Sequence, residues 1–243
     1  MENFVQRYMK VINQLRVEKN WIFIFLLQKK DKNIHVLEPM CGNGRMLIPF
    51  MQNGVNIEGF DISKDMLKVC KDKAEKLNLK PVVSQGRIEE YHSDKKYDLI
   101  MIPIGSFSLL PNNLVDNSLQ NMKNNLKENG KLLLTVVQGG SEIEQILDWI
   151  ETNRKEINNE LIVEYRKVSY DKAQKPLNII LKYEIIHDEK IKETEIMDFP
   201  IRLYDLKEFE NILIINGFSQ IVVHEIKDGY GEGNSFHVFE CSL

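Results

Sequence analysis

Glycines and carboxylates near the start of the chain have the spacing of a site that holds a ribose-bearing ligand. Gly42 and Gly44 follow an apolar run that ends at Glu38, and Asp61 stands at the end of a second apolar run. Glycines in such a loop leave room for a ligand against the main chain, and the helix that follows offers free N–H groups. A carboxylate at the end of the next strand can accept hydrogen bonds from both ribose hydroxyls. The pattern therefore predicts a strand, loop and helix around a nucleotide-type cofactor.

The spacing of the glycines disfavours two common nucleotide ligands. A dinucleotide site has the pattern G-x-G-x-x-G, but Leu47 stands where the third glycine belongs, which argues against NAD and FAD. No Gly-Lys-Ser/Thr triplet occurs, which argues against an ATP-binding P-loop. Glu38 suits a ligand with a positively charged amino group and would repel a pyrophosphate. S-adenosylmethionine carries an ammonium, a sulfonium and a ribose, so it fits these observations.

The stretch from Leu37 to Arg45 resembles motif I of the class I S-adenosylmethionine-dependent methyltransferases. The likeness continues in order through residues 59–67, 97–100 and 126–133, over about half of the chain. Bacterial small-molecule methyltransferases with an added antiparallel sheet are especially similar, because they carry Gly-Ser-Phe after the fourth strand, as residues 105–107 do here. This resemblance implies S-adenosylmethionine as the cofactor.

Two positions depart from the family pattern. Met40 stands where the first glycine of motif I belongs, and Arg87 stands near the place where many relatives have an aspartate beside the adenine amino group. We therefore expect the adenine contact from the backbone around Arg87 and Ile88, or from Gln85. The cofactor-binding residues implied by the resemblance are Glu38, Pro39, Met40, Cys41, Gly42, Asn43, Gly44, Arg45, Asp61, Ile62, Met66, Gln85, Gly86, Arg87, Ile88, Pro103 and Ile104.

Candidates for the wall of an acceptor pocket are Tyr8, Ser106, Phe107, Tyr170, Arg202 and Tyr204. Ordinary packing is an equally good explanation for the three tyrosines and the arginine. No histidine stands out as a catalytic base. A sulfonium is already a good leaving group, so the protein's contribution is mainly to align the acceptor and the methyl group in a water-poor pocket.

The composition excludes several classes of protein. The 243-residue chain is 43% hydrophobic and 28% charged, which is typical of a globular protein of one or two domains. A formal net charge of -4 argues against a surface that neutralises nucleic acid. The chain has no CxxC pair among its three cysteines, Cys41, Cys70 and Cys241, so we expect no metal site. The same cysteine usage predicts a cytoplasmic location. The apolar run from Trp21 to Leu27 is far shorter than the ~20 residues that span a bilayer, so no membrane contact is expected.

The periodicity predicts an α/β fold with a Rossmann-like, mostly parallel seven-stranded sheet. Residues 1–30 would form a helical cap over the cofactor, residues 31–158 and 201–243 the Rossmann-like domain, and residues 159–200 an inserted antiparallel lid. Ser63 should cap one helix, Asn129-Gly130 should end another, and Asp188-Glu189-Lys190 should form a hairpin turn. The predicted strands are 34–38, 55–60, 81–84, 97–102, 131–137, 218–226 and 234–242, with helices at 45–52 and 205–216.

The resemblance implies that the chain moves a methyl group from S-adenosylmethionine to an oxygen or nitrogen atom of a small molecule by in-line displacement. The Asn/Asp-Pro-Pro-Tyr signature of enzymes that methylate amino groups of nucleic acids and glutamine is absent after the predicted fourth strand, where residues 102–105 read Ile-Pro-Ile-Gly. Two alternatives stay open: an RNA or protein methyltransferase, and a non-catalytic S-adenosylmethionine-binding module. A homodimer through the inserted sheet is a further expectation.

Overall fold

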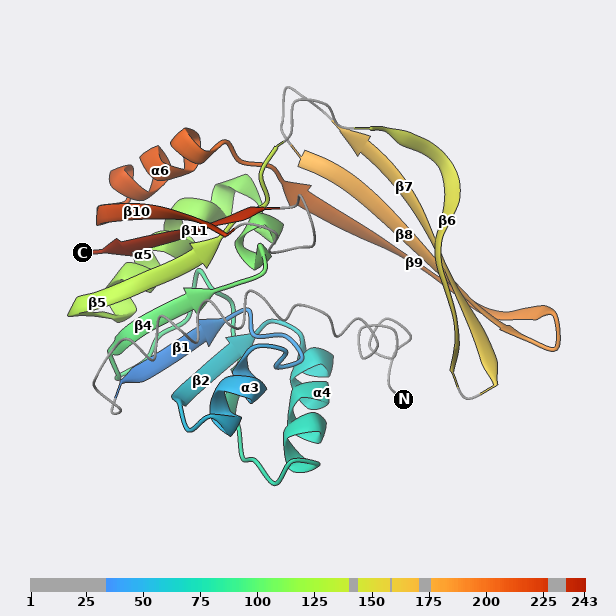
Figure 1. The fold of residues 1–243 in the computed structure, drawn as a ribbon, viewed down its shortest axis with the longest axis horizontal. Helices are drawn as coiled ribbons and strands as arrows, with labels where there is room; N and C mark the ends of the chain where they lie inside the picture. Colours follow the sequence, from blue (N-terminus) through green and yellow to red (C-terminus); the bar gives the residue numbers. More distant parts are fainter. Residues whose placement is uncertain (1–33, 140–143, 158, 171–175, 227–234) are drawn as a thin grey trace.

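The computed structural model describes residues 34–139, 144–157, 159–170, 176–226 and 235–243. These residues form two sheets, one of seven strands with helices packed on it and one of four strands that extends away from it (Figure 1). The expected helical cap over residues 1–30, with Tyr8, lies outside the described residues.

The larger sheet confirms the predicted α/β architecture. Its strand order is β10-β11-β5-β4-β1-β2-β3. Strand β11 runs antiparallel to its neighbours β5 and β10, whereas the pairs formed among β1 to β5 are parallel. The strands are β1 (His35–Pro39), β2 (Asn56–Asp61), β3 (Val82–Gln85), β4 (Tyr97–Ile102), β5 (Leu126–Thr135), β10 (Ser219–Ile226) and β11 (Phe236–Ser242).

The central strands are apolar because both of their faces are covered. In β4, Leu99 and Met101 pack into one hydrophobic cluster and Ile100 and Ile102 into another, so successive side chains enter opposite layers. The first cluster also contains residues of α3 (Leu47–Gln52) and α4 (Lys64–Glu75). The second contains residues of α5 (Val115–Asn125) and α6 (Leu206–Ile215). Helices therefore cover both faces of the sheet.

One of the two predicted helix ends is confirmed and the other is wrong. Ser63 caps α4 as expected, because its Oγ accepts a hydrogen bond from Met66 N at 3.2 Å. The expected helix end at Asn129-Gly130 is wrong: α5 ends at Asn125, and Gly130 lies inside β5. The register of β5 with β4 shifts near this point, and a Cβ on Gly130 would lie 2.8 Å from the carbonyl oxygen of Tyr97. The glycine marks an irregular strand pairing rather than a helix end.

The second sheet is an antiparallel meander of four strands, and it begins earlier than expected. Its strands are β6 (Ile146–Ile157), β7 (Glu160–Tyr170), β8 (Pro176–His187) and β9 (Lys190–Arg202). The predicted start of this sheet at residue 159 therefore misses β6. The pairing of β6 with β7 shifts register twice, so apolar and polar residues do not alternate regularly along β6. The predicted hairpin turn is confirmed between β8 and β9, where Asp188 and Glu189 have φ of 49° and 60°.

Gly44 allows the loop after β1 to lie directly against α4. Its φ is +72°, and a Cβ at this position would lie 2.5 Å from Cys70 Sγ and 3.0 Å from Ile48 Cδ1. Gly54 has a similar φ of +76°, but a Cβ there would meet nothing within 4 Å. Both glycines have a left-handed backbone conformation, but only Gly44 has neighbouring atoms where a side chain would lie.

We expect Gly44→Ala to lower the free energy of unfolding by about 2–5 kcal/mol, because left-handed backbone and overpacking both act against the alanine. Gly54→Ala carries the backbone penalty alone and should lower it by about 1–2 kcal/mol. Urea unfolding of both variants measures the difference. Equal losses at the two sites would show that the loop can move away from α4 without penalty.

Candidate functional site

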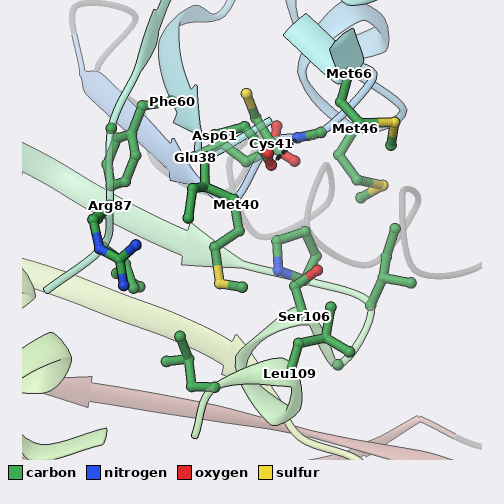
Figure 2. Close-up of a pocket in the computed structure, with 18 of the residues that line it drawn as sticks. Glu38, Met40, Cys41, Met46, Phe60, Asp61, Met66, Arg87, Ser106 and Leu109 are labelled. Atoms are coloured by element: carbon green, nitrogen blue, oxygen red, sulfur yellow. Dashed lines mark hydrogen bonds between the residues drawn. The ribbon is translucent and has the colours of Figure 1, made fainter. Parts of the chain in front are cut away.

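A cavity of about 600 Å³ opens where β1, β2 and β4 end (Figure 2). This is the edge at which open α/β sheets bind ligands. Figure 2 shows Glu38, Cys41 and Asp61 at one end of the cavity and Ser106 and Leu109 at the other, with Met40 between them. The lining residues are Glu38, Met40, Cys41, Gly42, Asn43, Arg45, Met46, Phe60, Asp61, Ile62, Met66, Gly86, Arg87, Ile88, Glu89, Pro103, Ile104, Gly105, Ser106, Leu109, Leu110, Pro111, Leu114, Val137, Phe199 and Ile201.

The loop after β1 turns sharply through three left-handed residues. Met40, Gly42 and Gly44 have φ of 57°, 52° and 72°. Met40 thus adopts the conformation that a glycine would adopt most easily, which explains how the loop is kept although a side chain replaces the first glycine of the motif. The hydrogen bonds from Cys41 N to Phe60 O and from Gly44 N to Cys41 O close the loop.

Asp61 holds this loop against the end of β2. Its Oδ2 accepts a hydrogen bond from Gly42 N at 2.8 Å, and its Oδ1 accepts one from Ser63 N at 2.8 Å. A carboxylate has about four acceptor positions, so two backbone donors leave capacity for further donors. Because Asp61 also lines the cavity, that capacity is available to a ligand's hydroxyl groups.

Glu38 places an acidic side chain deep in the cavity, where it is only 3% exposed. Burial, with the nearby Glu38 carboxylate adding to it, raises the pKa of the Cys41 thiol far above its usual range. The cavity cysteine is therefore protonated at neutral pH and is a poor nucleophile. A buried carboxylate is stabilised by a positive charge beside it, so this end of the cavity suits a cationic group.

An aromatic pair forms a further part of the wall. Phe60 lines the cavity and stacks on Tyr91, with ring centroids 4.0 Å apart and an interplanar angle of 12°. A Cβ on Gly86 would lie 3.5 Å from the Phe60 ring and 3.6 Å from that of Tyr91, so the chain passes close to the pair. Arg87 reaches the cavity and pairs with Glu89 at 2.6 Å. The surface is flat and apolar beside polar groups, as a heteroaromatic base requires.

The turn after β4 is held in an uncommon conformation. Ile104 and Gly105 have φ of 62° and 66°. A left-handed β-branched residue is an outlier, and such strain persists only where the surroundings enforce it. Gly105 N donates to Thr135 Oγ1 at 2.6 Å, and Val137 N donates to Ser108 Oγ at 2.8 Å. These bonds tie the turn to the end of β5 and place Ser106 on the cavity wall.

The far side of the cavity is apolar and comes from three separate parts of the chain, one of which is Val137 just after β5. The 3-10 helices η1 (Ser106–Leu109) and η2 (Asn112–Leu114) supply part of it, and the end of β9 supplies Phe199 and Ile201. We call this surface the apolar wall. Its members are Leu109, Leu110, Pro111, Leu114, Val137, Phe199 and Ile201.

Arg202 fixes the end of β9 to the main domain. Its Nη1 donates to Asn112 Oδ1 in η2 at 2.7 Å, and its Nη2 lies 3.3 Å from Glu208 Oε1 in α6. The guanidinium also lies over the Tyr204 ring, 4.6 Å from the centroid. Because Ile201 precedes Arg202 and η2 carries Leu114, these contacts join two of the three parts of the apolar wall.

Several of the predicted site residues that the structure describes do not line the cavity. Phe107 and Tyr204 are 0% and 1% exposed, and both pack edge to face on Phe209 in the core. Tyr170 pairs with Leu177 in the second sheet, and the Gln85 side chain donates to the carbonyl of Ile62. The predicted residues that stay off the wall are Pro39, Gly44, Gln85, Phe107, Tyr170, Arg202 and Tyr204. Tyr8 lies outside the described residues.

The other predicted residues come together in the cavity, and further residues join them. Met46, Phe60, Glu89 and the members of the apolar wall were not predicted. The Leu-Leu-Pro run after Ser106 and the shared side of Phe199 and Ile201 on β9 were available as signals. Neither signal indicates that the segment after Ser106 and the end of β9 meet in space, because their contact depends on how the second sheet packs against the main domain.

Within the described residues, no group of His, Cys, Asp and Glu is placed to hold a metal ion, and no helix is long and apolar enough to cross a membrane. The three cysteines are buried and unpaired with one another.

Comparison with known proteins gives one family and a set of distant relatives. Residues 30–197 match a family described as a methyltransferase domain. The chain is 26% identical over 171 residues to a ubiquinone biosynthesis O-methyltransferase of Rickettsia conorii, which covers 67% of this chain and 53% of that protein. It is 29% identical over 196 residues to a malonyl-[acyl-carrier protein] O-methyltransferase of Ilyobacter polytropus, covering 78% and 70%. The chain thus spans little more than half of the Rickettsia relative.

Solved structures share the fold at low sequence identity. An S-adenosylmethionine-dependent methyltransferase from Clostridium acetobutylicum matches with a TM-score of 0.76 and 16% identity, over 99% of this chain and 97% of that one. A sugar N-methyltransferase from Streptoalloteichus matches with a TM-score of 0.78 and 13% identity, over 99% and 92%. Both sheets of the present chain therefore have counterparts in known folds.

We expect Arg202→Gln to lower the free energy of unfolding by about 2–3 kcal/mol, because it removes charge-assisted hydrogen bonds of a largely buried side chain. Arg154→Gln is the matched control, since Arg154 pairs with Glu151 on the exposed surface of β6 and should change little. Thermal and urea unfolding of both variants test this. Equal stability of the two variants would mean that β9 is held in place without Arg202.

Proposed function

Because the chain belongs to the methyltransferase-domain family, we propose that it transfers the methyl group of S-adenosylmethionine to an oxygen or nitrogen atom of a small molecule by in-line displacement. The observation that carries this proposal is the Asp61 carboxylate, which lines the cavity while Gly42 N–H holds it in place. The names of two relatives support a small-molecule acceptor, since they are a ubiquinone biosynthesis O-methyltransferase and a sugar N-methyltransferase.

The residues present fit S-adenosylmethionine. Asp61 would accept hydrogen bonds from the ribose hydroxyls, and the buried Glu38 carboxylate favours the positively charged part of the ligand. Phe60, Met66 and Ile88 offer an apolar surface to the adenine ring. The volume of about 600 Å³ lies in the usual range for small-molecule sites, roughly 300–1,000 Å³.

The chemistry requires little from the chain beyond alignment and exclusion of water. When bound, S-adenosylmethionine supplies a methyl group on a sulfonium, which leaves as a neutral thioether. The chain's own residues would orient the acceptor against that methyl group and keep water away through the apolar wall. Cys41 is protonated, and burial raises the pKa of Tyr204 to about 12, so neither is suited to act as a general base. The proposed reaction is thus direct transfer without a covalent enzyme intermediate.

We further propose that the second sheet contributes a wall to the acceptor site rather than a lid, since Phe199 and Ile201 at the end of β9 line the cavity. The net charge of -4 supports a small acceptor over nucleic acid. A homodimer through this sheet and a cytoplasmic location stay predictions.

The first test is binding and turnover. The purified chain should bind S-adenosylmethionine and S-adenosylhomocysteine in calorimetry and should bind NAD far more weakly, because a pyrophosphate would meet the Glu38 carboxylate. Incubation with amines, phenols and alcohols, beside RNA and protein substrates, should release S-adenosylhomocysteine with a small molecule. Tighter binding of NAD than of either S-adenosyl compound would refute the cofactor. Turnover with RNA or protein alone would refute the acceptor class.

The second test concerns the ribose contact. Asp61→Ala should weaken S-adenosylmethionine binding by about 1.5–3 kcal/mol, the range for hydrogen bonds to a charged group. Asp65→Ala is the control, because Asp65 lies in the first turn of α4 and does not line the cavity. Calorimetry and thermal melts should be run on both variants. Unchanged affinity with a sharply lower melting temperature for Asp61→Ala would make this residue purely structural.

A further inference from the structure

The cavity lining divides sharply by charge. Every titratable side chain among the described lining residues comes from residues 38–89, the part that precedes β4. From residue 103 onward the wall carries Ser106 as its one polar side chain among the residues that the structure describes. The cavity therefore has a charged half, which fits the cofactor, and an uncharged half that faces it.

Three polar side chains next to the apolar wall, Thr135, Ser108 and Arg202, have partners within the fold, whereas the buried Arg202 Nε and Tyr204 hydroxyl have none among the described residues. Thr135 Oγ1 accepts from Gly105 N, and Ser108 Oγ accepts from Val137 N. Arg202 is the cation of β9 that follows the wall residue Ile201. It donates to Asn112, lies 3.3 Å from the Glu208 carboxylate and has its guanidinium over the Tyr204 ring. Because Arg202 and Tyr204 do not line the cavity, a charged ligand group at the wall would lose its water without gaining a partner from these side chains.

We propose that the end of the acceptor that is methylated is uncharged and largely apolar. This inference rests on the proposed function, since it assumes that the charged half holds S-adenosylmethionine. An ion stripped of water beside an apolar surface is strongly disfavoured, whereas apolar surface gains roughly 25 cal/mol for each Å² that it buries. The wall therefore selects against phosphate, carboxylate and ammonium groups at this end of the acceptor. It admits an aromatic or aliphatic group that carries a neutral amine or hydroxyl.

The chemistry of transfer agrees with this assignment. The lone pair of a neutral acceptor atom forms the bond to the methyl carbon, and the carbon–sulfur bond breaks with its electron pair kept on sulfur. The acceptor atom then gives its proton to water. The apolar wall has no carboxylate or imidazole that could remove that proton earlier. An acceptor atom that is neutral and can attack the methyl group without prior loss of a proton therefore fits the site best.

The test uses three probes of similar shape and different charge. Naphthol is neutral at neutral pH, naphthoate is an anion and naphthylmethylamine is a cation. Each is titrated by calorimetry into the full chain saturated with S-adenosylhomocysteine. We expect naphthol to bind at least roughly tenfold more tightly than either ion, a difference of about 1.4 kcal/mol.

A pair of variants on one strand ties the preference to the wall. Ile201→Lys places a cation in the cavity, so it should weaken naphthol binding by roughly tenfold and reverse the preference towards naphthoate. Ile196→Lys, also on β9 but 59% exposed and outside the lining, should bind all the probes as the parent does. Both variants should keep the parent affinity for S-adenosylhomocysteine, which shows that they are folded. Phe199→Ala, which shortens the wall without adding charge, should weaken naphthol while keeping the order of the probes.

Several outcomes would overturn the inference. These are naphthoate or naphthylmethylamine binding as tightly as naphthol, no binding of any probe, or equal behaviour of the two lysine variants when both are folded. Failure of the proposed function looks different, because the parent chain would then not bind S-adenosylhomocysteine at all.

Discussion

The hydrogen bonds between the Asp61 carboxylate and two backbone N–H groups hold one end of the cavity together. Oδ2 accepts from Gly42 in the loop after β1, and Oδ1 accepts from Ser63, which in turn caps α4. One side chain thus sets the position of a loop, a strand end and a helix start. Removing a side chain that lines a cavity and also holds the surrounding backbone in place alters both the cavity surface and the backbone. The loop shape and the proposed ribose contact would therefore both depend on a single side chain.

The cavity is built on backbone that the rest of the fold must hold in place. Met40 and Ile104 both have left-handed φ and both line the cavity. Each such residue costs about 1–3 kcal/mol and persists where its surroundings are rigid. The surroundings here are β1 and β4, which pair directly and whose apolar side chains are almost fully buried. Rigid central strands thus allow a strained rim, and that rim fixes the positions of the side chains that a ligand would meet.

The charged half of the cavity could be predicted from the sequence because its signals are local. Glycine spacing, an acidic strand end and a carboxylate at the end of the next strand all act within one strand-loop-helix unit, and Glu38, Gly42 and Asp61 do share the cavity. The apolar wall depends on contacts between distant segments, which no local pattern encodes. Phe107 and Tyr204 show the same limit: their neighbours mark them as pocket residues, yet both lie in the aromatic core around Phe209. Strand β6 was missed because its register shifts break the alternation of polar and apolar residues.

The charged half and the apolar wall come from different parts of the sequence, which affects how such a protein can change over generations. Residues 38–89 supply the charged half, and the segment with η1 and η2, Val137 and the end of β9 supply the apolar wall. A substitution at Phe199 or Leu114 alters what the wall admits and leaves the loop around Gly42 untouched. If the proposed function holds, mutation can explore new acceptors without loss of the methyl donor. Inheritance of the proposed donor site and drift of the proposed acceptor site would then be nearly independent events.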